Sequence, residues 1–158
     1  AVGGAERSHS VLNGLRQLDG QARDDDWVLV HDAARPCVRT SDIDILIDTL
    51  AGDSQGGLLG VRVADTVKRA DAQDRITGTV DRAGLWRALT PQMFRVGHLR
   101  AALEQALAGG RTVTDEAAAM ELAGYQPRMV EGRGDNIKIT MPSDLALAAF
   151  YLNSGSQL

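Results

Sequence analysis

The chain has 158 residues, of which 44% are hydrophobic and 24% charged, with a formal net charge of −4, a composition that predicts one globular domain and excludes a disordered chain. The mild acidity excludes general binding to nucleic acid, and the lack of a signal-peptide core or of an apolar run near the roughly 20 residues of a membrane span predicts a cytoplasmic protein without membrane contact. The single Cys37 and three scattered histidines exclude an internal disulfide and a Cys/His zinc site.

The first half of the chain alternates helical and strand-like patterns. Apolar residues at helical spacing predict a helix with Ser10 as its N-cap. The uninterrupted apolar run 27–30 is typical of a strand buried on both faces of a parallel sheet. Ser41 and Asp44 form a capping box at the start of the next helix. The expected order is therefore helix, strand, helix and strand, over residues 10–18, 27–30, 40–50 and 58–63.

A long polar stretch, 64–82, follows the second strand. Its two β-like ends flank the turn-prone residues 71–74, which predicts a hairpin or extended arm. Pairing of its strands would bring Thr66 and Lys68 near Arg82. Hydroxyls beside cations suit a phosphorylated polyol, but the same pattern is typical of a solvated β-ribbon with cross-strand charge pairs.

The second half continues the alternation of strands and helices. An apolar segment is closed by Thr90-Pro91, Thr114 is expected as the N-cap of a helix that ends at Gly124, and Ser143 is expected to cap the final helix. The expected segments are 85–89, a helix over 96–107, the helix from 114, short strands over 128–131 and 136–139, and the helix from 143. This alternation predicts an α/β fold with a mostly parallel sheet.

Asp32 is a candidate ligand residue because it follows the most buried-looking strand by two residues. Ligands of open α/β sheets bind beyond the carboxyl ends of the strands, and a carboxylate there can hold Mg²⁺ on a nucleotide phosphate. Ala33 and Ala34 leave room for backbone amides to approach a ligand, and Arg35 adds a fork that matches phosphate. A turn in which Asp32 hydrogen-bonds its own backbone is the structural alternative.

Lysine is rare in this chain. Only two of the seventeen basic residues, Lys68 and Lys138, are lysines, which favours a need for a compact, flexible ammonium at those positions. Lys138 lies within an expected short strand, where a charged side chain needs an explanation. A contact with a ligand is one explanation, and a position on an edge strand of the sheet is the structural alternative. Thr114 precedes two acidic residues, and acidic residues are favoured in the first turn of a helix. Helix capping alone therefore explains this group of residues.

Seven stretches of the chain, taken together, resemble the 2-C-methyl-D-erythritol 4-phosphate cytidylyltransferase family. They run in the order of the family's motifs over about residues 3–152. The stretches are Gly3-Gly4-x-Glu6-Arg7-x-x-Ser10-Val11, Val30-His31-Asp32-Ala33-Ala34-Arg35-Pro36, Asp65-Thr66-Val67-Lys68, Thr79-Val80-Asp81-Arg82-x-Gly84-Leu85-Trp86, Leu89-Thr90-Pro91-Gln92, Thr112-Val113-Thr114-Asp115-Glu116-Ala117 and Asp135-Asn136-Ile137-Lys138-Ile139-Thr140.

The resemblance implies a transfer of a cytidylyl group from CTP to methylerythritol phosphate, with Mg²⁺ or another divalent cation. It implies that Asp32 is the metal ligand at the CTP phosphates and that Lys138 and Arg82 are the catalytic pair that fixes the substrate phosphate for in-line attack. The implied nucleotide contacts are Gly4, Ser10, Asp32 and Ala33, and the implied substrate contacts are Arg35, Thr66, Arg82, Thr90, Thr114 and Lys138.

The resemblance also implies a Rossmann-like sheet of the nucleotide-diphospho-sugar transferase type with a protruding β-arm. The arm, at about 64–82, would join a homodimer and carry Arg82 into the partner's active site. The family's glycine-rich nucleotide loop would precede Ala1, so that residues 1–158 are expected to be the carboxyl-terminal two-thirds of one domain and inactive alone. Ala5 departs from the Asp that some relatives carry near the base.

Two other functions are compatible with these residues. One is a cytidylyltransferase that acts on another pentitol phosphate, such as ribitol 5-phosphate. The other is a non-catalytic, dimeric ligand-binding module. Competition between polyol phosphates distinguishes the first, and CTP binding by the whole protein distinguishes the second.

Overall fold

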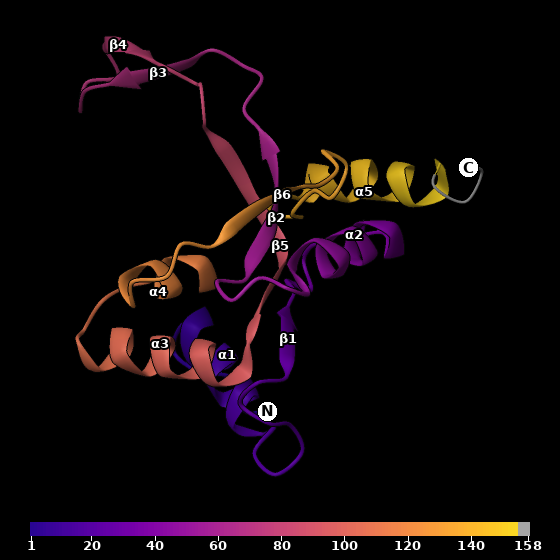
Figure 1. The fold of residues 1–158 in the computed structure, drawn as a ribbon. Coiled ribbons are helices and arrows are strands. Elements are labelled where there is room, and N and C mark those ends of the chain that lie inside the picture. The colour runs from indigo at the N-terminus through magenta and orange to yellow at the C-terminus, as the bar shows by residue number, and fades with distance from the viewer. Residues whose placement is uncertain (155–158) are drawn as a thin grey trace.

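The computed structural model describes residues 1–154, in which a four-stranded sheet carries helices on both faces (Figure 1). The sheet order is β1-β5-β2-β6. Its strands are β1 (Trp27–Val30), β2 (Gly57–Arg62), β5 (Trp86–Arg95) and β6 (Arg128–Glu131). The expected α/β fold is confirmed, and the strand 27–30 has the predicted bounds.

The pairing within the sheet is mixed. Strands β1, β2 and β6 run in one direction, but β5 lies between β1 and β2 and pairs with both in the antiparallel sense, so that only β2 and β6 form a parallel pair. The reason is the connection. The chain leaves β2 through the arm and returns directly as β5, and a return without a crossover helix reverses the strand direction.

The arm forms the predicted hairpin. Its strands, β3 (Val67–Ala70) and β4 (Ile76–Val80), pair antiparallel, and they project from the sheet at the top of Figure 1. Asp71 closes the turn, because its Oδ1 accepts the backbone N–H groups of Gln73 and Arg75 at 3.0 and 2.9 Å. Two connecting segments, 63–66 and 81–85, join the hairpin to the body, and the second contains a turn at residues 83–84.

The two faces of the sheet bury different clusters, because neighbouring strand residues point to opposite faces. Leu58 and Phe94 pack against α1 (Arg7–Arg16), α3 (Val96–Ala108) and α4 (Glu116–Leu122). Leu59 and Met93 pack on the other face with Leu46 and Leu50 of α2 (Thr40–Leu50). Full burial of such side chains contributes about 1.5–3 kcal/mol each. The sheet is therefore held firmly at the strand ends that carry the site.

Several expected helix starts are wrong in detail. Helix α1 begins at Arg7, three residues before Ser10, which lies inside the helix. Helix α2 has the expected bounds but no side-chain cap at Arg39. Asp115, not Thr114, caps α4 by accepting the Ala118 N–H at 2.9 Å. Of these three helices only α4 has a side-chain cap, so a polar residue near the start of an apolar pattern does not by itself fix the first residue of a helix.

The last helix, α5 (Pro142–Ser154), begins before the expected cap Ser143, which lies inside it, and Asp144 is the acidic residue of its first turn. Asp144 accepts the backbone N–H groups of Thr140 and Met141, both at 2.9 Å. These hydrogen bonds lower the pKa of Asp144 below its ordinary value. Leu145 and Phe150 are exposed on this helix. Within residues 1–154, no helix combines the length and the apolar character that a membrane crossing requires.

Two expected strands also differ. The apolar segment 85–89 does not stop at Thr90-Pro91, because β5 continues to Arg95. Residues 136–139 are not a strand. Strand β1 is only half-buried along its length, since it lies at one edge of the described sheet.

Candidate functional site

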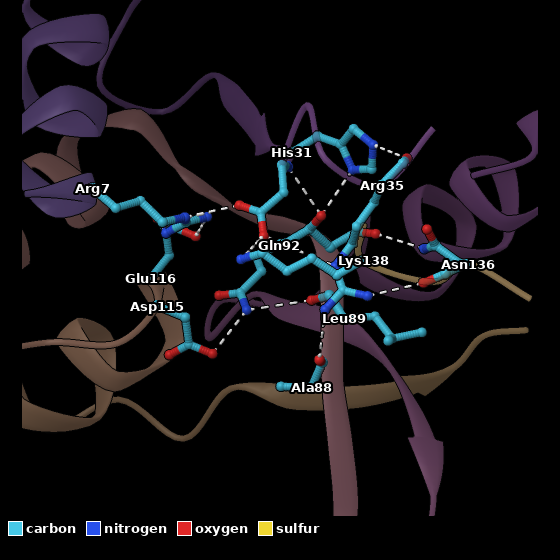
Figure 2. A network of polar contacts seen from close by, with 12 residues as sticks. Arg7, His31, Arg35, Ala88, Leu89, Gln92, Asp115, Glu116, Asn136 and Lys138 are labelled. Carbon is cyan, nitrogen blue, oxygen red and sulfur yellow. Dashed lines mark hydrogen bonds and ion pairs between the residues drawn. The ribbon is translucent and has the colours of Figure 1, made fainter. Parts of the chain in front are cut away.

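The end of β1 places Asp32 between two cations, Arg7 and Lys138, both of which are labelled in Figure 2. Oδ1 of its carboxylate accepts a hydrogen bond from Nε of Arg7 at 2.8 Å, and Oδ2 accepts one from Nζ of Lys138 at 2.9 Å. Nε of Arg35 lies 3.9 Å from the same Oδ2. The Asp32 side chain is only 12% exposed, so this cluster joins a largely buried carboxylate to three basic residues.

The electrostatics keep Asp32 ionised. Burial raises its pKa, but the hydrogen bonds and charges of Lys138 and Arg7 outweigh burial, and the pKa lies below its ordinary value. Burial lowers the pKa of Arg35 below its ordinary value, and the charge of Asp32 offsets this effect of burial only in part. Three basic side chains, those of Arg7, Arg35 and Lys138, contact the Asp32 carboxylate. They outnumber the carboxylates of Asp32 and Glu116 that they pair with, a balance that favours anionic ligands such as phosphates.

Arg7 is anchored by a second carboxylate. Its Nη1 and Nη2 donate to the two oxygens of Glu116 at 2.5 and 3.0 Å, and the Glu116 side chain is 1% exposed. Burial lowers the pKa of Arg7, but Glu116 and Asp32 outweigh burial and raise it above its ordinary value. A buried pair of this kind is satisfied at both ends, as burial of charges requires.

Gln92 of β5 fixes the start of α4, where Glu116 lies. Its side-chain amide donates to Asp115 at 3.0 Å and accepts the Ala117 N–H at 2.8 Å. Gln92 is 1% exposed. Strand β5 and helix α4 are therefore joined directly beneath the site, which explains how Glu116 meets Arg7 across 109 positions of the chain.

Lys138 reaches Asp32 from an extended loop. The Ile139 N–H donates to the Ala34 carbonyl at 2.8 Å, and the buried Asn136 side chain donates to the Thr90 carbonyl at 2.8 Å. Arg35 donates to the Asn136 carbonyl at 2.9 Å. These three contacts hold the loop against the segment that follows β1 and against the middle of β5, so that its position does not depend on strand pairing.

The hydroxyl of Thr90 is engaged by protein groups. Its Oγ1 accepts the Asp32 N–H at 3.1 Å and lies 2.9 Å from Nδ1 of His31. The other ring nitrogen of His31 lies 3.0 Å from the Arg35 carbonyl oxygen. Thr90 is 4% exposed. These hydrogen bonds tie the loop 31–35 to β5.

Two cavities meet at the ion network. Both are lined by Arg7, Asp32 and Lys138. The first, of about 160 Å³, is also lined by the predicted substrate contacts Arg35, Thr90 and Thr114. The second, of about 360 Å³, is also lined by the predicted nucleotide contacts Ser10 and Ala33. The network therefore forms a shared wall between the two groups of predicted contacts.

Gly4 lies in the loop before α1 and makes a close approach to that helix. Its N–H donates to Oγ of Ser10 at 2.9 Å. A Cβ atom at this position would lie 2.2 Å from Cβ of His9, so only glycine fits here. The structure thus brings Gly4 and Ser10 together.

The arm residues lie away from this cluster. The Arg82 guanidinium donates to the Ala64 carbonyl, and Thr66 is exposed at the base of the arm. Lys68 donates to Thr79 at 2.6 Å across the two strands, which matches a solvated β-ribbon. Of the predicted contacts, Thr66 and Arg82 are the two that this chain does not bring to the network.

Sequence reasoning missed three residues of the network. Arg7, His31 and Glu116 all occur in the stretches that resemble the family, but the sequence assigns none of them a role in binding or catalysis. For His31 the sequence excludes only a Cys/His zinc site. The acidic pair after Thr114 is explained equally well by a helix start. The contact of Arg7 with Glu116 leaves no local pattern, so a single sequence carries no signal for it.

Among residues 1–154, no group of three or more His, Cys, Asp or Glu side chains could hold a metal ion. Mg²⁺ at nucleotide sites is usually bound by one or two carboxylates together with phosphates and water, not by a cage of protein ligands. The ionised carboxylate of Asp32 fits that type of site.

The family profile of 2-C-methyl-D-erythritol 4-phosphate cytidylyltransferase matches residues 1–154. An enzyme of that name from Pseudomonas aeruginosa is 58% identical over 146 residues, which are 92% of this chain and 62% of the relative. The Aeromonas hydrophila enzyme is 59% identical over 150 residues, 95% of this chain and 59% of the relative. The chain therefore spans about three-fifths of the length of these relatives.

The crystal structure of the Francisella tularensis 2-C-methyl-D-erythritol 4-phosphate cytidylyltransferase is similar in fold. The TM-score is 0.86 at 41% identity, over 94% of this chain and 69% of that one. This similarity confirms the expected type of α/β fold, although two of the three strand pairs in the described sheet are antiparallel and not parallel as expected.

Proposed function

Because this chain belongs to the 2-C-methyl-D-erythritol 4-phosphate cytidylyltransferase family, we propose that the whole protein transfers a cytidylyl group from CTP to 2-C-methyl-D-erythritol 4-phosphate. The products are 4-diphosphocytidyl-2-C-methyl-D-erythritol and pyrophosphate. The observation that carries the proposal is the shared wall of Arg7, Asp32 and Lys138 between two cavities. Such a wall suits a reaction that joins two phosphorylated molecules.

The nucleotide would occupy the cavity beside α1. Gly4 and Ser10 would contact the cytidine, a backbone group of Ala33 would contact the phosphates, and Asp32 would hold a divalent cation. When bound, that cation would neutralise phosphate charge. These roles are supported by the close approach of Gly4 to α1 and by the ionised state of Asp32.

The polyol phosphate would occupy the smaller cavity. Arg35, Thr90 and Thr114 would bind it, and Lys138 would fix its phosphate. An oxygen of that phosphate attacks the α-phosphorus of CTP, a new P–O bond forms, and the bond to pyrophosphate breaks. Positioning and charge neutralisation suffice for this step, and no covalent enzyme intermediate is needed.

A homodimer would complete the site. The arm at 64–82 projects from the body (Figure 1), and we propose that it carries Thr66 and Arg82 into the site of the partner. The covered share of the relatives supports the proposal that residues 1–158 form about two-thirds of one cytidylyltransferase domain. Action in the cytoplasm stays a prediction.

The test is the turnover of the whole protein with CTP and methylerythritol phosphate. Lys138→Ala and Arg82→Ala should each lower kcat by at least about a hundredfold, since each removes a charge that positions the attacking phosphate. Arg16→Ala is the matched control. Arg16 is the last residue of α1 and forms an exposed ion pair with Glu104 of α3, away from the ion network. Wild-type rates in both site variants would overturn the proposal, and ribitol 5-phosphate as a competing substrate tests the polyol.

A further inference from the structure

We infer that Arg7, anchored by Glu116, is a positioning residue that fixes one oxygen of the Asp32 carboxylate and leaves the other available for ligand exchange. The inference rests on the proposed function, because it assigns Asp32 a ligand. Its basis is the unequal way in which the two oxygens of Asp32 are held.

Oδ1 of Asp32 is held by a rigid partner. Arg7 uses Nε for Asp32 and both Nη groups for Glu116, so its planar fork is fixed at three points. Glu116 is itself almost fully buried and lies at the start of α4. Rotation of the Arg7 guanidinium would break the pair with Glu116 and leave a buried carboxylate without a partner, which is strongly unfavourable. Oδ1 therefore stays with Arg7.

Oδ2 of Asp32 is held by a mobile partner. Lys138 donates a hydrogen bond to it, and 43% of the Lys138 side chain is exposed. Nε of Arg35 lies 3.9 Å from the same oxygen, beyond hydrogen-bond distance. An ammonium on a flexible stem can turn to an incoming phosphate at little cost. The Asp32 carboxylate would then keep its orientation through Arg7 while Oδ2 becomes free for a cation.

The position of Arg7 agrees with this role. Arg7 lines both cavities. Its Nε nevertheless donates to Asp32, and its two Nη groups donate to Glu116, beside which it lies in Figure 2. Because its hydrogen bonds go to two carboxylates, Arg7 orients the metal ligand Asp32 and does not itself bind phosphate. Supporting residues of this kind commonly alter metal affinity about 10- to 100-fold when they are changed.

The experiment measures the binding of Mn²⁺ in the presence of CTP by electron paramagnetic resonance, with the whole protein and its variants. Arg7→Lys keeps the positive charge but cannot bridge two carboxylates. Glu116→Gln removes the anchor but keeps an acceptor for Arg7. Both should weaken Mn²⁺ binding about 10- to 100-fold and raise the apparent KM for Mg²⁺. Arg16→Lys, the control on the same helix, should change neither.

The free energy of unfolding is measured in parallel. If both variants lose stability but bind Mn²⁺ within about twofold of the wild type, Arg7 and Glu116 are a structural pair and the inference is overturned, while the proposed function stands. If Arg7→Lys does not fold, Glu116→Gln decides by itself. If the wild type neither binds Mn²⁺ with CTP nor transfers a cytidylyl group, the proposed function fails and this inference fails with it.

Discussion

At the scale of single residues, Gly4 is a position where any added side chain would meet a neighbour. In Gly4→Ala, the new Cβ would collide with Cβ of His9, and the loop would have to leave Ser10. We expect CTP affinity to fall about tenfold or more, as misplaced binding groups do, with little change in stability because the loop is exposed. Calorimetric titration with CTP measures this. Gly3→Ala is the control, since its Cβ would meet only Oγ of Ser10 at 3.9 Å.

Asp42 offers a second prediction, for stability against pH. It is 3% exposed, and burial raises its pKa. When the pKa of an acid is higher in the folded than in the unfolded state, the folded state binds the proton more tightly. The free energy of unfolding therefore falls as the pH rises from the pKa of the unfolded state through that of the folded state. Asp42→Asn should therefore stabilise the protein at pH 7 and lose that advantage towards pH 3. Urea unfolding across this range tests the sign, and an advantage that is equal at all pH values would contradict it.

Among the elements, the parallel pair of β2 and β6 depends on Gly57. Gly57 lies opposite Arg128 in the register, and a Cβ there would lie 2.2 Å from the Arg128 carbonyl oxygen. Gly57→Ala should lower the free energy of unfolding by about 1–3 kcal/mol, because backbone atoms cannot yield as side chains do. Gly52→Ala, which meets nothing within 4 Å, should leave stability nearly unchanged. Equal effects in the two variants would contradict the clash.

For the molecule as a whole, the arm decides the oligomeric state under our proposal. An isolated two-stranded hairpin is marginally stable in water, and Ile76 on the arm is 67% exposed. If the arm packs against a partner, Ile76→Asp should halve the mass measured by light scattering and abolish turnover, since Arg82 would no longer reach a second site. Ile45→Asp places the same charge at an exposed isoleucine of α2 and should remain dimeric. A dimeric Ile76→Asp variant would argue against the arm.

Local patterns were enough for most elements. The apolar spacing within 40–50 and the run 27–30 predict a helix and a strand with the observed bounds, because side-chain periodicity is a property of consecutive residues. The hairpin in the arm follows for the same reason. Candidate ligands such as Asp32 were found because polar residues after a buried strand stand out in the sequence itself.

The sequence by itself thus determined the class of fold, the arm and the residue types of the site. Only the tertiary structure decided that β5 runs between β1 and β2, that Lys138 comes from a loop and that Arg7 joins Asp32 to Glu116. These features are contacts between residues that lie up to 109 positions apart. Such contacts are decided by how buried faces and charges are satisfied together, and no local pattern of residues records that.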